Sequence, residues 1–218
     1  MAVASSLRAF PKEKAIVSEE IATKMYATFP YFFGKAISEL PMVAFFNSLF
    51  AVLVSKLTGL NGNTRTKWRR FLTLNSMHGL AAQSLGLFLG AISPNSDVAL
   101  GLLPPVIILN LIFDGKHISE ESVPRLLRWI PKLGLVRWCF EGFCINEFDG
   151  LEFDTAGPRR GPVAKTGDEA LHGIGLGERT LGDVFRAQGI IIAGAWFLSY
   201  LGLALTSQKF QVMDLPTP

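Results

Sequence analysis

Stretches without charged residues divide the chain into apolar blocks separated by polar ones. Four windows contain no Asp, Glu, Lys or Arg, namely residues 40–55, 71–96, 98–113 and 187–208. The charged residues gather in the segments between these windows, whereas a soluble domain distributes them over all its exposed faces. Such blocks predict helices that cross a membrane, because about 20 apolar residues are needed to span about 30 Å of hydrocarbon.

The windows 71–96 and 187–208 are long enough to span a membrane without extension. The window 40–55 extends backwards to residue 31, and Lys35 and Glu39 in this extension are four residues apart, so they can share a helix face and neutralise each other. The window 98–113 is short, and it is either a buried core helix or a short or kinked membrane helix. The neighbouring spans favour the second interpretation.

We therefore predict an all-α polytopic membrane protein with four transmembrane helices, at about residues 31–57, 70–92, 97–113 and 187–208. Asn75, His78 and Gln83 lie in the second of these helices, where each should face a neighbouring helix or a watery path rather than lipid. The same helix has small residues at four-residue spacing, Ala82, Gly86 and Gly90. They either allow another helix to approach closely or reflect the ordinary composition of membrane helices.

The long polar segment 114–186 begins with a semi-apolar stretch, Val123 to Ile145. Trp129, Pro131 and Trp138 in this stretch suit amphipathic or re-entrant helices that rest at the membrane boundary. The part from residue 154 to residue 182 is rich in Gly and is expected to be a loop with one short helix near Asp168–His172.

Composition and motifs exclude several classes of protein. The net charge of +3 is too small to predict a nucleic-acid partner. Two cysteines, Cys139 and Cys144, are too few for a disulfide framework, and no metal-ligand motif is present. No phosphate-binding loop or hydrolase motif occurs, so the chain is expected to be neither an ATPase nor another enzyme.

Several strings of residues together resemble one family of membrane transporters. The most specific pair is Arg137-Trp138-Cys139-Phe140-Glu141-Gly142 followed by Ile145-Asn146-Glu147-Phe148-Asp149-Gly150-Leu151. Shorter strings lie at residues 10–15, 31–35, 38–41, 128–131, 166–171 and 208–211. Over about residues 10–212, the chain resembles the C-terminal portion of the ABC-2 type membrane domain in the G subfamily of ABC transporters, the white-type half-transporters.

This resemblance implies a six-helix domain of which the chain holds the third to sixth helices. Residues 1–30 would be a cytosolic segment that couples to the ATPase domain, with Lys14, Glu19 and Glu20 at the contact. Residues 31–113 would hold three membrane helices, 114–186 a large external loop with re-entrant helices, 187–208 the last membrane helix and 209–218 a cytosolic tail. The charge distribution of the loops does not choose an orientation, so this placement follows from the resemblance.

The resemblance also implies a transport path and a gate. Ile107, Asn110 and Leu111 are candidates to line the path near a dimer axis, with ordinary helix packing as an equal alternative. The gate region would be Phe113, Asp114, Lys116 and His117. Where some family members have a pair of leucines, this chain has Lys116 and His117, which predicts a gate that is either wetter or controlled by charge, with a histidine able to titrate near neutral pH.

The expected function is the membrane-spanning part of an ATP-driven exporter of lipid-like or amphipathic molecules. The chain itself would bind no cofactor or metal, and ATP and Mg²⁺ would act through an ATPase domain supplied elsewhere, together with the first two membrane helices. Its partners would be membrane lipid, the ABC ATPase domain and a homo- or hetero-dimer partner. The protein would be integral to the plasma membrane or an organelle membrane. The alternative is a truncated, non-transporting remnant or an interaction subunit of a membrane complex.

Overall fold

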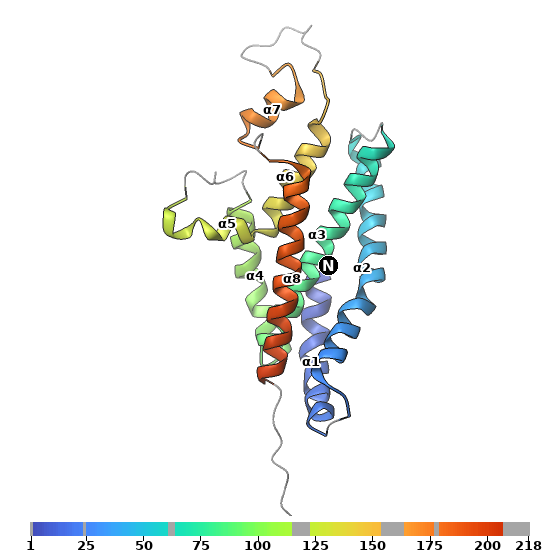
Figure 1. Ribbon diagram of the computed structural model, residues 1–218, viewed down its shortest axis with the longest axis vertical. Helices are drawn as coiled ribbons and strands as arrows, with labels where there is room; N and C mark the ends of the chain where they lie inside the picture. Colours follow the sequence, from blue (N-terminus) through green and yellow to red (C-terminus); the bar gives the residue numbers. More distant parts are fainter. Residues whose placement is uncertain are drawn as a thin grey trace, which may run out of the picture.

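The computed structural model is an elongated bundle of helices (Figure 1). It describes residues 2–23, 25–60, 64–114, 123–153, 164–176 and 179–206. Within these ranges the helices are α1 (Ala2–Ala22), α2 (Thr28–Thr58), α3 (Arg65–Ile92), α4 (Ser96–Ile112), the short 3₁₀ helix η2 (Arg125–Leu127), α5 (Trp129–Leu133), α6 (Leu135–Phe148), α7 (Gly167–Gly173) and α8 (Leu181–Thr206). The described part has no strand beyond an isolated bridge between Glu152 and Thr166, which confirms the all-α class.

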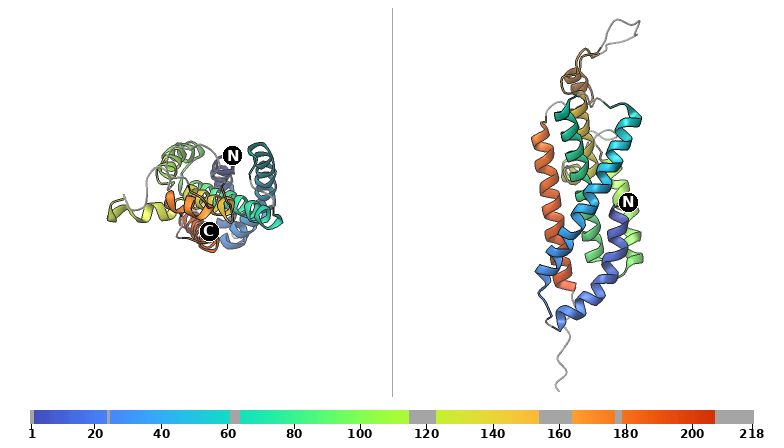
Figure 2. Two further views of the ribbon diagram at one scale, coloured as in Figure 1. Left: turned by 90° about the horizontal axis from the view of Figure 1, so that it is seen from above. Right: turned by 90° about the vertical axis from the view of Figure 1, so that its right-hand side faces the viewer.

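Helix α3 forms the centre of the bundle. It contacts α1, α2, α4, α6 and α8, and the view from above in Figure 2 places it between α2 and α8. α2 is antiparallel to α3, whereas α8 runs in the same direction as α3, from the α7 end of the molecule towards the opposite end. The remaining helices therefore surround α3 rather than forming a layer beside it.

Three groups of buried apolar side chains hold these helices around α3. Phe10, Phe32, Leu87, Ala91 and Leu203 join α1, α2, α3 and α8. The second group, Leu7, Leu89 and Ala99, joins α1, α3 and α4, and the third, Leu74, Trp138 and Val184, joins α3, α6 and α8. The core is thus continuous along α3 and uses residues from nearly every other long helix.

Two glycines allow α3 to lie close to its neighbours α2 and α1. A Cβ atom on Gly79 would lie 1.6 Å from Nδ2 of Asn47 on α2, and one on Gly90 would lie 3.3 Å from Phe10 on α1. Gly90 was one of the small residues at four-residue spacing. At this position the spacing therefore reflects close helix approach rather than composition alone.

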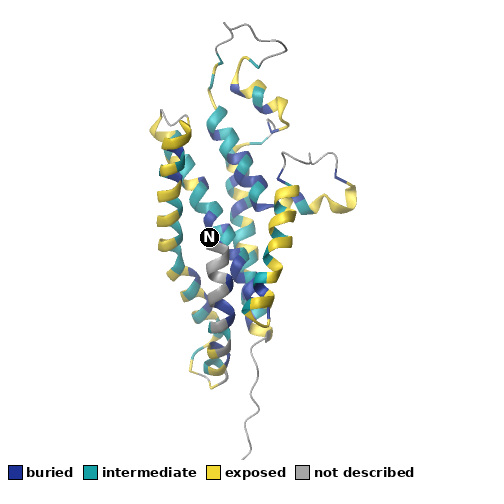
Figure 3. Cartoon of the chain, turned by 180° about the vertical axis from the view of Figure 1, so that it is seen from behind, coloured by how far each residue is buried: buried dark blue, intermediate teal, exposed yellow. Residues whose placement is uncertain are grey.

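Large apolar side chains cover the outer faces of α2 and α4. On α2 these include Phe45, Phe46, Leu53 and Leu57, and the outer face of α4 has a similar character (Figure 3). Pro104 and Pro105 lie inside α4 without ending it. Apolar outer faces around a bundle that contains polar side chains are typical of helices that contact lipid.

The four predicted spans are only partly supported. In the described part, two helices are long and apolar enough to cross a membrane, Thr28–Thr58 and Leu181–Leu205. α4 is apolar but has 17 residues, and α3, which contains the window 71–96, is not among the two. α3 begins at Arg65 and includes several basic and amide side chains, so it is more polar than a lipid-facing helix. Other helices surround it, which allows this composition. The count of four stays a prediction.

Candidate coupling site and transport path

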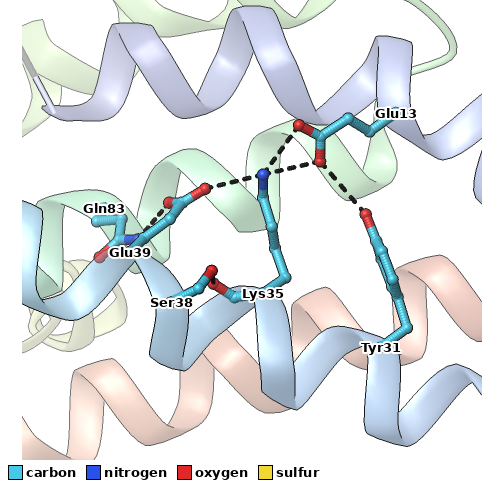
Figure 4. Close-up of polar contacts among 6 residues, drawn as sticks. All are labelled: Glu13, Tyr31, Lys35, Ser38, Glu39 and Gln83. Atoms are coloured by element: carbon cyan, nitrogen blue, oxygen red, sulfur yellow. Dashed lines mark hydrogen bonds and ion pairs between the residues drawn. The ribbon is translucent and has the colours of Figure 1, made fainter.

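A cluster of charged side chains connects α1, α2 and α3 (Figure 4). Lys35 on α2 lies between two carboxylates: its Nζ is 2.8 Å from Oε2 of Glu13 on α1 and 3.1 Å from Oε1 of Glu39 one turn further along α2. The contact between Lys35 and Glu39 confirms the pair predicted from their four-residue spacing. Glu13 was not predicted to take part, because it comes from a helix 22 residues earlier in the chain.

Polar side chains extend this cluster at both ends. The hydroxyl of Tyr31 donates to Oε2 of Glu13 at 3.3 Å, and the buried amide of Gln83 on α3 donates to Oε2 of Glu39. Gln83 therefore faces a neighbouring helix, as predicted for the polar residues of this window. Asn75 does the same, because its Nδ2 donates to the carbonyl oxygen of Asn47 at 2.7 Å. The cluster links three helices through ionic and hydrogen bonds rather than through apolar packing alone.

The partial burial of the charged cluster determines how much its ion pairs contribute to stability. Lys35 has a side-chain exposure of 19%, whereas Glu13 and Glu39 keep 39% and 25%, so solvent weakens each pair only in part. Loss of the lysine would leave two carboxylates close together without the cation between them, which is costly in a half-buried site. A displacement of α1 at Glu13 is therefore resisted by both α2 and α3.

Lys14, predicted at the ATPase contact, reaches the end of α3 within this chain. Its Nζ donates to the carbonyl oxygen of Ala91 at 2.7 Å and lies 3.4 Å from that of Ser93. A cation at this place stabilises the last carbonyl groups of a helix. Partial burial lowers the pKa of the Lys14 ammonium below its ordinary value. Lys14 thus fastens α1 to α3.

Glu19 and Glu20 lie at the far end of α1, away from the charged cluster. The side chain of Glu19 is exposed, whereas Glu20 accepts a hydrogen bond from the hydroxyl of Tyr26 in the turn before α2. This bond, together with burial and the negative charge of Glu20, raises the pKa of Tyr26 to about 12. Of the two acidic residues, Glu19 is the one that presents its carboxylate to the surroundings.

The three predicted path residues differ in their surroundings. Ile107 and Leu111 lie on the outer face of α4 with exposed side chains. Asn110 instead turns towards α6: its Nδ2 donates to the carbonyl oxygen of Val106 and its Oδ1 accepts from the backbone N–H of Leu135 at 2.8 Å. Leu135 is the first residue of α6, where the backbone N–H has no partner within the helix, so Asn110 satisfies that N–H from another helix.

The predicted gate region is described only in part. Phe113 ends α4, and its carbonyl oxygen lies close to Gly134, where a Cβ atom would approach it to 3.6 Å. Asp114 is buried. Lys116 and His117 lie outside the described residues. The region therefore adjoins the turn between α5 and α6, to which Asn110 also binds.

The structure offers no visible metal site in its described ranges. No group of three or more His, Cys, Asp or Glu residues there could hold a metal ion, and Cys139 and Cys144 are both free thiols. The short helix predicted near Asp168–His172 is confirmed as α7. The contacts of Glu13 and Asn110 join distant parts of the chain, so no local spacing in the sequence indicates them.

Comparisons with known proteins agree with this architecture. The family model of the ABC-2 type transporter matches residues 1–148. ABC transporter G family member 7 of Arabidopsis thaliana is 32% identical over 214 residues, which cover 98% of this chain and 29% of that protein. Protein white of Drosophila melanogaster is 26% identical over 215 residues, covering 95% of this chain and 30% of the relative.

A third relative, the ABC transporter ATP-binding protein/permease wht-1 of Caenorhabditis elegans, is 29% identical over 140 residues, or 64% of this chain and 21% of that protein. The chain spans less than a third of the length of each of these relatives. The matching family is that of the membrane domain rather than of an ATPase domain. The chain therefore belongs to the ABC-2 type transporter family, alongside ABC transporter G family members and white proteins, and corresponds to the membrane part of an ABC transporter.

Proposed function

We propose that this chain is the membrane-spanning part of an ATP-driven exporter of lipid-like or amphipathic molecules, working with a dimer partner. An ABC ATPase domain supplies ATP binding and hydrolysis with Mg²⁺. The family match over residues 1–148 is the observation that carries this proposal. One relative includes both an ATP-binding protein and a permease in its name, which supports an ATPase domain as the source of energy.

In this proposal, α1 receives the movement of the ATPase domain. Exposed Glu19 at the far end of α1 provides a contact, and Glu20 supports the turn that leads to α2 through Tyr26. The bonds of Glu13 and Lys14 then pass the displacement to α2 and α3. Residues 1–30 and 209–218 lie on the cytosolic side, and segment 114–186 on the external side.

The proposed path follows α4 and ends at the gate region. Ile107 and Leu111 offer an apolar surface to an amphipathic molecule, because their side chains are exposed in this chain. Asn110 sets the position of α6 beside that surface. Phe113 and Asp114, followed by Lys116 and His117, form the outer limit, where a polar gate would admit water more readily than a pair of leucines.

A reconstitution experiment tests the proposal. The chain is co-expressed with an ATPase-bearing G-family partner, purified through a tag on the chain and placed in vesicles with a fluorescent phospholipid analogue. We expect the partner to co-purify and the vesicles to move the analogue only with ATP and Mg²⁺. If the partner does not co-purify and no transport occurs, the result favours the non-transporting remnant. Co-purification without transport favours the interaction subunit.

A matched pair of variants tests the coupling part. Lys35→Met removes the cation between Glu13 and Glu39, so we expect transport to fall strongly while co-purification and ATP binding persist. Ser38→Ala is the control, because the Ser38 hydroxyl donates only to the carbonyl oxygen of Lys35 within α2. Equal transport by the two variants would contradict a coupling role for the charged cluster.

A further inference from the structure

A cavity of about 250 Å³ lies between α2, α3 and α6, at the end of the molecule remote from the charged cluster. Its walls are mainly aromatic and aliphatic: Phe50 and Val54 from α2, Phe71 from α3 and Phe143 from α6. The rings of Phe71 and Phe143 are 5.1 Å apart, and Trp68 stacks on Phe71 at 5.8 Å. The cavity thus has an aromatic wall built from two helices.

The cavity lies at the height where membrane helices meet the polar boundary. α2 ends at Thr58, and α3 begins at Arg65 after the connecting loop. Trp68 and Lys67 lie in the first turns of α3, and tryptophan and lysine are typical of that boundary. On the adjoining face of α2, Leu53 and Leu57 are exposed and would contact lipid. A lipid molecule beside α2 can therefore reach the cavity without entering the centre of the bundle.

Two opposite charges mark the polar edge of the cavity. Glu147 is one of its lining residues. Lys67, one turn before Phe71 on the same helix face, directs its ammonium to the carbonyl oxygen of Asp149 at 2.6 Å and lies 3.5 Å from that of Glu147. An ammonium has three hydrogens to donate, and these two carbonyl groups account for two of them in the described part of the chain. The Lys67 ammonium and the Glu147 carboxylate lie beside a second ion pair, in which Nη1 of Arg70 is 3.0 Å from Oδ2 of Asp149, so the charges at this edge balance.

We propose that this cavity binds one acyl chain of a zwitterionic phospholipid from the adjoining leaflet. The phosphate of the headgroup lies against Lys67, and its quaternary ammonium lies near Glu147 and the face of Trp68, because aromatic faces attract such cations. At about 250 Å³ the cavity is smaller than pockets for drug-sized molecules, which are roughly 300–1,000 Å³, so it takes one acyl chain rather than two. An anionic lipid is disfavoured, because its extra negative charge would meet Glu147.

The proposal is independent of transport, because this lipid is held at the side of the bundle and away from α4. Its role is that of a bound structural lipid that fills the space between α2 and the pair α3 and α6. A membrane protein gains packing contacts from such a lipid in the same way as from a neighbouring helix.

Photo-crosslinking tests the site. The purified chain is placed in phosphatidylcholine nanodiscs that contain a trace of phosphatidylcholine with a photoreactive group on its acyl chain, and the modified peptides are identified by mass spectrometry. We expect the modified residues to cluster around Phe50, Phe71 and Phe143. Labelling spread evenly along the exposed apolar face of α2 would overturn the proposal.

Two variants of α2 separate cavity binding from general lipid contact. Ala51 is buried and lines the cavity, so Ala51→Phe fills the space, and we expect labelling there to fall roughly tenfold, about 1.4 kcal/mol in affinity. Leu57→Phe, at an exposed position of the same helix, is the control and should leave labelling unchanged. Unchanged labelling in a folded Ala51→Phe protein would overturn the proposal.

A substitution at the charged edge tests the headgroup without a change in volume. Wild-type protein should be labelled more strongly by the phosphatidylcholine probe than by a phosphatidylserine probe with the same photoreactive chain. Glu147→Gln removes one negative charge from this edge, so the preference should move towards phosphatidylserine. A wild-type preference for phosphatidylserine, or displacement of the probe by an equal amount of a sterol, would contradict the zwitterionic phospholipid.

Discussion

Helices α2 and α3 are neighbours, yet they treat polar and apolar side chains in opposite ways. α2 turns Phe45, Phe46 and Leu57 outwards, whereas α3 buries Leu87 and Gln83 almost completely. α2 is long and apolar enough to cross a membrane, whereas α3 is not apolar enough. Hydropathy therefore indicates which helix faces lipid, and a helix enclosed by other helices can hold polar side chains if each finds a partner.

The largest expected effect comes from matched leucine truncations on the two helices. Leu87→Ala on α3 removes a side chain with no exposed surface, so we expect the free energy of unfolding to fall by about 2 kcal/mol or more. Leu53→Ala on α2 removes a side chain that is 54% exposed and should cost about 0.5 kcal/mol or less. Chemical unfolding in detergent micelles measures both free-energy changes. Equal losses would contradict the conclusion that α3 is enclosed and α2 is exposed.

Glycine substitutions test the same distinction through close approach. A side chain at Gly79 would overlap the Asn47 side chain on α2, so Gly79→Leu must displace that side chain or separate the helices and should cost about 1–3 kcal/mol. A Cβ atom at Gly34 on α2 would meet nothing within 4 Å, and Gly34→Leu is the matched control. Thermal unfolding followed by tryptophan fluorescence compares them. A lower midpoint for Gly34→Leu than for Gly79→Leu would be the contrary result.

A third test concerns the polar interior of α3. Gln83→Leu removes the amide that donates to Glu39, and we expect a loss of about 1 kcal/mol. Thr73→Val on the exposed side of the same helix removes a bond to the carbonyl oxygen of Arg69 and should cost less. If Gln83→Leu stabilised the protein in an unfolding titration, the amide would not be a stabilising partner of Glu39.

The smallest effect is a pH dependence in the turn between α1 and α2. Because the pKa of Tyr26 is raised from its ordinary value of 10.0 to about 12, its hydrogen bond to Glu20 is fully present below pH 10. That contribution is lost as the pH rises through about 12. Absorbance titration of the phenolate should show a high-pKa component that disappears in Tyr26→Phe and shifts towards pH 10 in Glu20→Gln. An unshifted component in Glu20→Gln would assign the raised pKa to burial alone.

Local spacing was sufficient for much of the helical framework. The pair Lys35 and Glu39 and the helix at 167–173 followed from the sequence because each depends on residues a few positions apart. The helices extend beyond the predicted membrane spans: α3 begins at Arg65 and α8 at Leu181, where the Thr180 hydroxyl donates to Asp183. Charged residues marked the ends of the windows, but a helix can continue through them beyond the apolar region.

Contacts between distant residues could not be predicted in this way. Glu13, Gln83 and Asn110 are ordinary polar residues in the sequence, and their partners become evident only when α1, α3 and α6 are packed. The same holds for the bonds of Lys14 to carbonyl groups at the end of α3, which lie 77 and 79 positions away in the sequence. The specific partners were therefore missed, although Gln83 was correctly expected to face a neighbouring helix rather than lipid.

The two prolines of α4 make this helix weakest at its middle. Pro104 and Pro105 have no N–H to donate, so the carbonyl groups of Leu100 and Gly101 lack their usual donors four residues later. Asn110 lies beyond this point and is bonded to the start of α6. A bend of α4 at the prolines would therefore displace its C-terminal half and, through Asn110, the start of α6.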